Sequence, residues 1–289
     1  MDTQLLAAFL SVAKTRSFSL AAAELKLTQS AVSKRINQLE QQLQCQLFDR
    51  VGRITYLSEA GKLLLPRAKH ILQEIEDTQR FIADHQGNVG GDLRIATSHH
   101  IGIHRLPPIL ERFTRQHSDV HLQLHFIDSE QAPQAVARGD YDIALITLPE
   151  HLPEVKVTQQ TLWHDPMCFV VKPSHPLATA GGITLKQLAH FPAILPDTTT
   201  YTTGLIQRLF ATQSVPLTIA MTTNHLDAIK MMVSVGLGWS VLPETLLAKG
   251  LQKIRVDNLS ITRQLGCIHH KDRSLSNAAT AFLALATKR

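Results

Sequence analysis

Residues 17–53 read SFSLAAAELKLTQSAVSKRINQLEQQLQCQLFDRVGR, and this stretch decides how the N-terminal part of the chain folds. It predicts two short helices, a tight turn between them and a basic tail. We expect Thr28 to cap the second helix, because its hydroxyl can accept a hydrogen bond from an unpaired amide of the first turn. Apolar residues then recur at spacings of 4, 3 and 4, as in a helix packed on its neighbours; they are Val32, Ile36, Leu39 and Leu43.

The opposite face of this helix is polar and carries no acidic residue; it consists of Gln29, Ser30, Ser33, Lys34 and Asn37. Amides and hydroxyls can hydrogen-bond to base edges in the major groove of DNA, and a lysine can contact phosphate. Three alanines at 21–23 let the preceding helix pack closely, as a helix-turn-helix requires. The stretch 50–56 predicts a β-turn between extended segments, a wing that would hold Arg50 and Arg53 near the DNA backbone or minor groove.

This stretch resembles the DNA-binding domain of LysR-type transcriptional regulators, and the block LSEAG at 57–61 extends the resemblance. The matching residues are Phe18, 21–23, Leu25, 27–33, Ile36, Leu39, Glu40, Leu47, Phe48 and Arg50. Ser30 departs from the family, in which many members have proline, but serine is tolerated in a first helical turn. The resemblance implies a winged helix-turn-helix that contacts DNA through Thr28, Gln29, Ser30, Ser33, Lys34, Asn37, Arg50 and Arg53.

Length and composition favour two domains and a polyanionic partner. The chain has 289 residues and a net charge of +5, and residues 1–58 hold seven Lys or Arg against four Asp or Glu. Three widely spaced cysteines without a C-x-x-C motif predict a reduced, cytoplasmic protein. The apolar segment 5–13 follows Asp2 rather than basic residues, so we expect no signal peptide. No apolar run approaches the roughly 18 residues of a membrane span, so we expect no membrane partner.

Residues 58–85 predict one long helix with a heptad-like apolar seam, formed by Leu64, Ala68, Ile71, Ile75, Thr78 and Ile82. Pro66 could kink this helix early. Two interpretations are open: the seam packs on its own domain, or it pairs with a second copy of the chain. The family resemblance implies such dimers, and commonly tetramers built from two of them. Three glycines within 86–91 predict a hinge after the helix.

After the hinge, strands and helices alternate, which predicts an α/β fold. The expected strands are 92–97, 120–126, 142–147, 166–171, 193–195, 217–222, 236–243 and 265–269. The expected helices are 104–116, 134–138, 185–189, 202–211, 226–235 and 277–287. They would form two lobes, with lobe 1 at 92–161 and 269–289 and lobe 2 at 162–268, enclosing a cleft like that of periplasmic binding proteins. The segments 185–188, 235–238 and 242–243 resemble the LysR-type effector domain.

We therefore divide the chain into four parts: a winged helix-turn-helix domain at 1–58, a linker (dimerisation) helix at 59–86, a hinge at 87–91 and an effector-binding domain at 92–289. Ligands of open α/β sheets lie beyond the carboxyl ends of strands. The residues expected to bind the effector there are Thr97, Ser98, His99, Thr147, Thr200, Tyr201, Thr202 and His225. Hydroxyls and helix-start amides favour a small anion, and the absence of Arg and Lys from these stretches favours a carboxylate over a phosphate. His99, His100 and His225 would add charge below about pH 6.5.

We expect no catalytic residues, cofactor or metal. The sequence has no GxGxxG, no P-loop and no GxSxG elbow, and His100 and His104, an i, i+4 pair, have no cysteine or carboxylate nearby in sequence. The prediction is a cytoplasmic, homo-oligomeric LysR-type regulator that binds double-stranded promoter DNA and responds to a small anionic effector. Two alternatives are open: a cytoplasmic solute-binding protein, or an enzyme with a non-functional helix-turn-helix domain.

Overall fold

The computed structural model describes residues 2–51, 54–84, 89–152 and 154–287. The chain divides into two compact units, 1–88 and 89–289, each with its own hydrophobic core. The N-terminal unit consists of α1 (Thr3–Thr15), α2 (Phe18–Glu24), α3 (Gln29–Leu43), β1 (Phe48–Val51), β2 (Ile54–Leu57) and α4 (Glu59–Asp84). Within the described ranges, no helix combines the length and the apolar character that crossing a membrane requires.

The first three helices each begin at a polar cap. The side chains of Asp2, Ser17 and Thr28 accept hydrogen bonds from backbone amides of the first turn of α1, α2 and α3. Lys26 takes a positive φ of 54°, which lets the chain turn between α2 and α3. The predicted apolar stripe is confirmed at Val32, Ile36 and Leu39, which are buried, but Leu43 is exposed because it lies in the last turn of α3.

The wing and α4 follow the expected order. β1 and β2 pair antiparallel, with Arg50 opposite Thr55, while the turn at 52–53 lies outside the described residues. The first half of α4 packs on the core of its own unit through Leu64, Ala68 and Ile71. Farther along the helix, Ile75 and Ile82 are exposed. The predicted seam is therefore divided, and only its second half remains uncovered within this chain.

One lobe of the C-terminal unit is built on three parallel strands, with β3 (Gly91–Thr97) between β4 (Val120–Phe126) and β5 (Ile143–Thr147). Its helices are α5 (His99–His104), α6 (Pro107–Gln116), α7 (Ala132–Arg138) and α11 (Asn277–Thr287). The single helix expected at 104–116 was wrong in its start. Pro107 occupies the first turn of α6, and a separate helix, α5, precedes it because the Pro107 nitrogen cannot continue the hydrogen bonding of α5.

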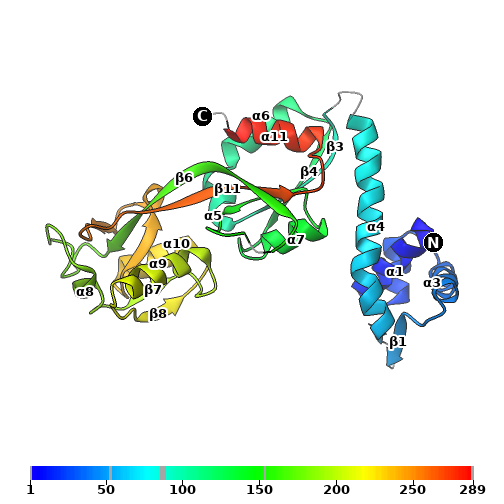
Figure 1. The fold of residues 1–289 in the computed structure, drawn as a ribbon, viewed down its shortest axis with the longest axis horizontal. Helices are drawn as coiled ribbons and strands as arrows, with labels where there is room; N and C mark the ends of the chain where they lie inside the picture. The colour runs from blue at the N-terminus through cyan, green and yellow to red at the C-terminus, as the bar shows by residue number, and fades with distance from the viewer. Residues whose placement is uncertain (1, 52–53, 85–88, 153, 288–289) are drawn as a thin grey trace. The chain divides into compact units, whose positions relative to one another are not determined.

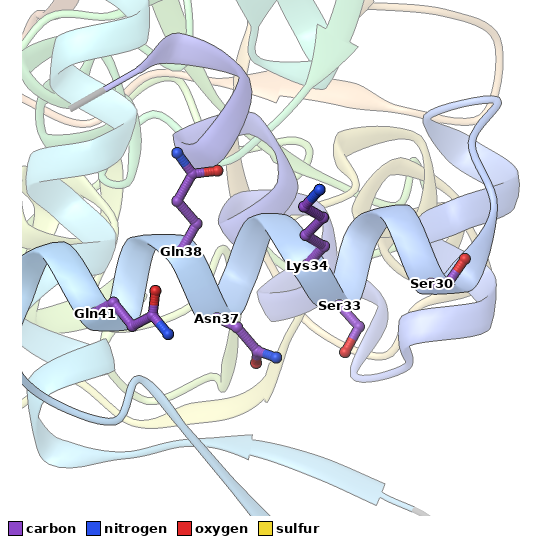
Figure 2. Close-up of a pocket in the computed structure, with 6 residues that line it drawn as sticks. All are labelled: Ser30, Ser33, Lys34, Asn37, Gln38 and Gln41. Carbon is purple, nitrogen blue, oxygen red and sulfur yellow. The ribbon is translucent and has the colours of Figure 1, made fainter.

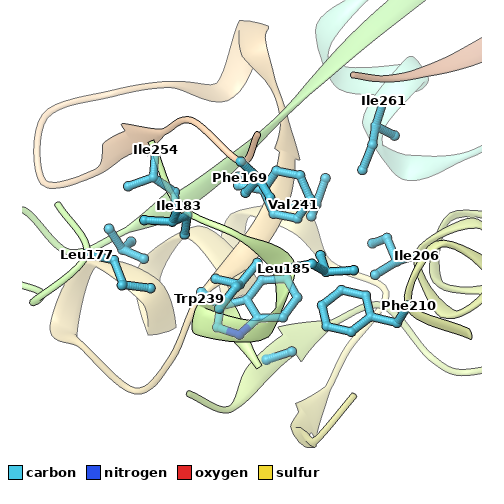
Figure 3. Packing of buried hydrophobic residues seen from close by; sticks show 14 of the residues in the cluster. Phe169, Leu177, Ile183, Leu185, Ile206, Phe210, Trp239, Val241, Ile254 and Ile261 are labelled. Atoms are coloured by element: carbon cyan, nitrogen blue, oxygen red, sulfur yellow. The ribbon is translucent and has the colours of Figure 1, made fainter. Parts of the chain in front are cut away.

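The other lobe has its core around Trp239 (Figure 3). Its elements are α8 (Leu185–Leu188), β7 (Ala193–Leu195), α9 (Tyr201–Thr212), β8 (Ile219–Thr222), α10 (Leu226–Val235), β9 (Ser240–Pro243), the 3₁₀ helix η1 (Glu244–Leu246) and β10 (Gln252–Ile254). The Trp239 ring stacks on Phe210 with centroids 5.7 Å apart, and its Nε1 donates to the Phe191 carbonyl at 2.8 Å. This bond satisfies the polar atom of a fully buried indole.

Two long antiparallel strands, β6 (Val157–Val171) and β11 (Ile261–His270), run from one lobe to the other (Figure 1). β6 starts nine residues before the expected strand at 166–171, because the exposed, polar stretch at its start hides the strand pattern. β10 was not predicted at all. The register of β6 and β11 shifts between Leu265 and Gly266, where a Cβ on Gly266 would lie 2.2 Å from the Gln160 carbonyl oxygen. Only glycine fits this crossing point.

Candidate functional site

One face of α3 is open and polar (Figure 2). A hollow of about 810 Å³ runs along it, lined by Ser30, Ser33, Lys34, Asn37, Gln38 and Gln41. Burial of Val32, Ile36 and Leu39 on the other side fixes which face of the helix is presented. At the start of α3, the Thr28 hydroxyl accepts a hydrogen bond from the Ala31 amide at 3.2 Å, so the first turn of this face is well defined.

The structure brings together four of the eight predicted DNA-contacting residues on this hollow, namely Ser30, Ser33, Lys34 and Asn37. Thr28 and Gln29 immediately precede them and are exposed, and the Gln29 side-chain oxygen accepts from the Ser19 hydroxyl at 3.3 Å. The Arg50 side chain and Arg53 lie outside the described residues. Gln38 and Gln41 also line the hollow and were not predicted, although their steps of four and seven from Lys34 place them on the same face.

Three acidic residues of this unit accept hydrogen bonds from other groups of the same unit. Glu24 accepts hydrogen bonds from Lys14 at 2.6 Å and from Ser11 at 2.7 Å, and the bond from Lys14 is the main reason why its pKa is lowered. Asp2 caps α1, and Glu40 accepts from the Leu47 amide at 2.7 Å. None of these three carboxylates lines the hollow on α3. Lys34 is the charged residue among the described residues that line the hollow.

A pocket of about 530 Å³ lies between the crossing strands and α9. It is lined by Thr147, Leu148, Pro149, Glu150, His151, Gln159, Met167, Tyr201, Thr202, Leu205, Ile206, Arg208, Val241, Ile261, Thr262, Arg263 and Gln264. Three of the eight predicted effector residues, Thr147, Tyr201 and Thr202, meet here. Arginine and lysine are absent from the local stretches that hold these three residues, but folding brings Arg208 and Arg263 to the same pocket.

The other five predicted effector residues do not line this pocket. Thr97 is fully buried, and Ser98 is the N-cap of α5. Thr200 caps α9 by accepting a hydrogen bond from the Thr203 amide at 3.3 Å. His99 and His225 face each other from opposite lobes, with ring centroids 5.1 Å apart. Three of the predicted residues therefore line the pocket, while His99 and His225 form a separate contact between the lobes.

A buried charge cluster lies at the crossing strands, and no pattern in the sequence predicted it. Arg263 on β11 donates to Asp165 on β6 from Nε at 3.0 Å and from Nη2 at 2.7 Å. Arg105, after α5, donates to the other Asp165 oxygen at 3.2 Å. The Arg263 Nη1 donates to the Thr202 hydroxyl at 3.1 Å, which links the cluster to the start of α9. In the sequence, Asp165 and Arg263 stand out only as charged residues beside apolar strand segments, and Arg105 follows a helix.

His100 packs against this cluster without a hydrogen bond. Its Nε2 lies 3.8 Å from Asp165, and neither ring nitrogen has a hydrogen-bonding partner among the described residues. Burial, reinforced by the charge of Arg263, lowers the pKa of His100 to about 4. The expectation that His100 gains charge below about pH 6.5 was therefore wrong, because desolvation outweighs the attraction of Asp165.

Several further side chains join the two lobes. The Glu130 carboxylate, from the segment between β4 and α7, accepts from the Tyr201 amide at 2.8 Å. Glu150 and Arg208 form an exposed ion pair at 2.9 Å, and His104 lies 3.9 Å from Asp227. One hydrogen bond, one ion pair and one histidine–carboxylate contact thus connect the two lobes. Among the described residues, no group of three or more His, Cys, Asp or Glu is arranged to hold a metal ion.

Family models account for both units. Residues 3–62 match the model of the bacterial regulatory helix-turn-helix protein, lysR family, and residues 86–289 match that of the LysR substrate binding domain. The chain belongs to the LysR family of transcriptional regulators. As a LysR-type regulator, it combines the helix-turn-helix unit with an effector-binding domain.

Relatives and solved structures agree with this assignment. The HTH-type transcriptional regulator YeiE of Escherichia coli K12 is 35% identical over 281 residues, which cover 95% of this chain and 93% of YeiE. Full-length CbnR complexed with its target DNA has a TM-score of 0.68 at 19% identity, covering 99% of this chain and 97% of CbnR. The effector-binding domain of QuiR in complex with shikimate has a TM-score of 0.62 at 22% identity, covering 68% and 96%. The two solved structures show that the LysR-type fold is shared.

Proposed function

We propose that this regulator binds promoter DNA through the polar face of α3, and that a small anion in the pocket beside α9 changes how it binds DNA. The positive charge at that pocket is the observation that supports an anionic effector. Arg263 lines the pocket, and its buried cluster sets two guanidiniums, of Arg263 and Arg105, against the one carboxylate of Asp165, a net charge of +1. His100 adds no charge near neutral pH, because its pKa is about 4. A buried excess of positive charge favours an anion.

The surroundings of Arg263 support a carboxylate ligand. The first turn of α9, at Tyr201 and Thr202, brings the positive end of the helix dipole to the pocket. Arg208 and His151 line the same pocket, and the charge of Arg208 is matched by Glu150. Shikimate, which the solved QuiR domain holds, is itself a carboxylate. The proposed ligand is therefore a small carboxylate or a similar anion that spans the pocket from α9 to the crossing strands.

The exposed half of α4 supports an oligomer. Ile75 and Ile82 lie one heptad apart on this helix, and both are exposed within the chain. Two recognition helices must be held one or more helical turns of DNA apart, and paired α4 helices would provide that spacing. We propose a dimer through α4 that associates further into a tetramer, acting on DNA in the cytoplasm. The relatives are named as transcriptional regulators, which supports regulation rather than catalysis as the role of the pocket.

Thermal-shift titrations of the full chain with acetate, succinate and shikimate test the anion pocket. A ligand that binds only the folded state raises the melting temperature as its concentration increases. Thr202→Ala should weaken the response several-fold, because Thr202 lines the pocket and accepts from Arg263. Thr212→Ala, the same substitution at the other end of α9, is the matched control. Stabilisation by cations such as spermidine but by no anion would contradict the proposal.

Ser98→Ala tests how far the site extends. Ser98 caps α5 without a side-chain hydrogen bond and does not line the pocket. A loss of succinate binding on Ser98→Ala would show that the effector reaches the end of β3, as the sequence predicts. Unchanged binding would confine the effector to the pocket between α9 and the crossing strands.

A further inference from the structure

The contact between Glu130 and Tyr201 places a carboxylate of one lobe on a helix of the other. Tyr201 is the first residue of α9, a helix of 12 residues, and its amide donates to Glu130 Oε1 at 2.8 Å. Amides in a first helical turn have no partner within the helix and carry partial positive charge. Glu130 thus occupies the position that an incoming carboxylate would take at the start of α9.

The environment of Glu130 is unfavourable for a negative charge. Burial raises the pKa of Glu130, and the charges of Asp128 and Asp197 raise it further. Hydrogen bonds from the backbone amides of Tyr201 and of Glu130 itself act in the opposite direction but do not offset the burial. The carboxylate is held at α9 against the cost of desolvation and of two neighbouring carboxylates. Such a contact is easier to replace than a fully compensated ion pair.

The effector pocket begins at the same helical turn. Tyr201 and Thr202 line the pocket, whereas Glu130 does not. A carboxylate that enters the pocket and binds the Tyr201 amide would have to take that amide from Glu130. Because Tyr201 has a single backbone N–H, the two carboxylates compete for it.

We propose that Glu130 is a resident carboxylate that closes the lobes in the unliganded regulator, and that an effector anion must displace it. This inference rests on the proposed anion pocket and names the residue that sets its selectivity and affinity. Displacement releases the segment 128–131 of lobe 1 from lobe 2. The segment is also tied to its own lobe, because the Thr147 amide donates to the Ser129 hydroxyl at 3.1 Å. Binding of the effector in the pocket therefore changes the contacts of the loop that leads into α7.

Removing the competing charge should strengthen anion binding. Glu130→Gln keeps the shape and the acceptor oxygen but loses the charge, and Glu130→Ala removes the group. Titration of the full chain with succinate, followed by calorimetry, should show both variants binding about fivefold more tightly or more, the scale of ordinary coupling between sites. Glu111→Gln removes the same charge from an exposed position on α6 of the same lobe and should bind like the parent.

Hydrogen exchange separates displacement from simple closure. Succinate should protect the amides of 201–204 in the parent while the segment 128–131 exchanges faster, because the ligand replaces Glu130. Protection of both segments would overturn the proposal, since Glu130 would then stay in place as the lobes close on the ligand. Equal succinate affinity in the parent, both Glu130 variants and Glu111→Gln would also overturn it while leaving the anion pocket intact. If none of the four proteins bound succinate, acetate or shikimate, the anion pocket itself would be wrong, and the displacement with it.

Discussion

Arg263 and Asp165 are direct partners in the antiparallel register of β11 and β6, and two hydrogen bonds join their side chains. Asp165 is fully buried and Arg263 nearly so. Arg105 and Thr202 extend this pair into both lobes. The crossing point of the effector-binding domain is therefore held by charge as well as by sheet hydrogen bonds.

Asp165→Asn should destabilise the C-terminal unit by about 3–5 kcal/mol, because it leaves the buried guanidinium of Arg263 and the partly buried one of Arg105 without their carboxylate. Both tryptophans, Trp163 and Trp239, lie in this unit, so fluorescence during urea unfolding reports on it selectively. Asp227→Asn, which removes an exposed partner of His104, should change the transition little. Similar urea midpoints for the two variants would contradict a structural role for the buried cluster.

His100 should make the stability of the same unit depend on pH. Its pKa is about 4 in the folded protein, against 6.5 for an ordinary histidine, so the unfolded chain binds the extra proton first. Stability should therefore be complete above about pH 6.5 and fall by roughly 3 kcal/mol as the pH decreases to about 4. His104, Arg105, Asp165 and Arg263 face this ring and also contribute.

His100→Phe separates the histidine from these neighbours, because it keeps a buried ring and removes the proton site. The variant should lose part of the decline in stability between pH 6.5 and 4, measured by urea unfolding at each pH. His121→Phe, at an exposed position on β4, should keep the full decline. A pH profile of His100→Phe that superimposes on the parent would exclude His100 as its source.

Two residues of α3, Gln29 and Lys34, should contribute to DNA binding in different ways, through a base contact and a phosphate contact. Gln29→Ala should reduce the difference in binding free energy between specific and random DNA by roughly 1–3 kcal/mol, because it removes an amide that would hydrogen-bond to a base edge. Lys34→Ala should weaken binding to all sequences and reduce the salt dependence, as expected for a phosphate contact. Lys186→Ala, which removes the same charge from α8, is the control. Fluorescence anisotropy at several salt concentrations would contradict the assignment if Lys34→Ala and Lys186→Ala behaved alike.

Assembly should depend on the uncovered half of α4. Ile75→Asp with Ile82→Asp would place two charges in the proposed helix pair, and light scattering should then show smaller species. Ile71 packs against the core of its own unit, so Ile71→Asp should lower the melting temperature of that unit instead. A parent-like mass for the Ile75/Ile82 double variant would show that this half of α4 does not join the copies.

The parts of the molecule that the sequence predicts are those with local patterns. Thr28 and the stripe from Val32 to Leu39 identify α3, since a cap and a helical period need only neighbouring residues. Tyr201 and Thr202 could be placed near the cleft because they start a helix beside a strand end. The same helical period would also have placed Gln38 and Gln41 on the polar face of α3.

The missed residues are joined by contacts between distant positions. Arg263 meets Asp165 across 98 positions, Arg105 meets Asp165 across 60, and Glu130 meets Tyr201 across 71. No local pattern specifies such pairs, because tertiary folding selects the partner. The exposed start of β6 was missed for a different reason: a strand with its polar residues in solvent has little apolar alternation to detect.

The register shift at Leu265 and Gly266 also limits how this domain can change in length. Asp165 and Arg263 lie on one side of the shift, and the pairing of 266–270 with 157–161 lies on the other, with Leu162 as the extra residue of β6. Side chains alternate between the two faces of a strand, so deleting one residue between 163 and 165 would turn Asp165 to the opposite face from Arg263. Insertions and deletions among related chains should therefore be absent from 157–171 and 261–270 and collect in connections such as 172–182. In these two strands, natural variation should be restricted to substitution.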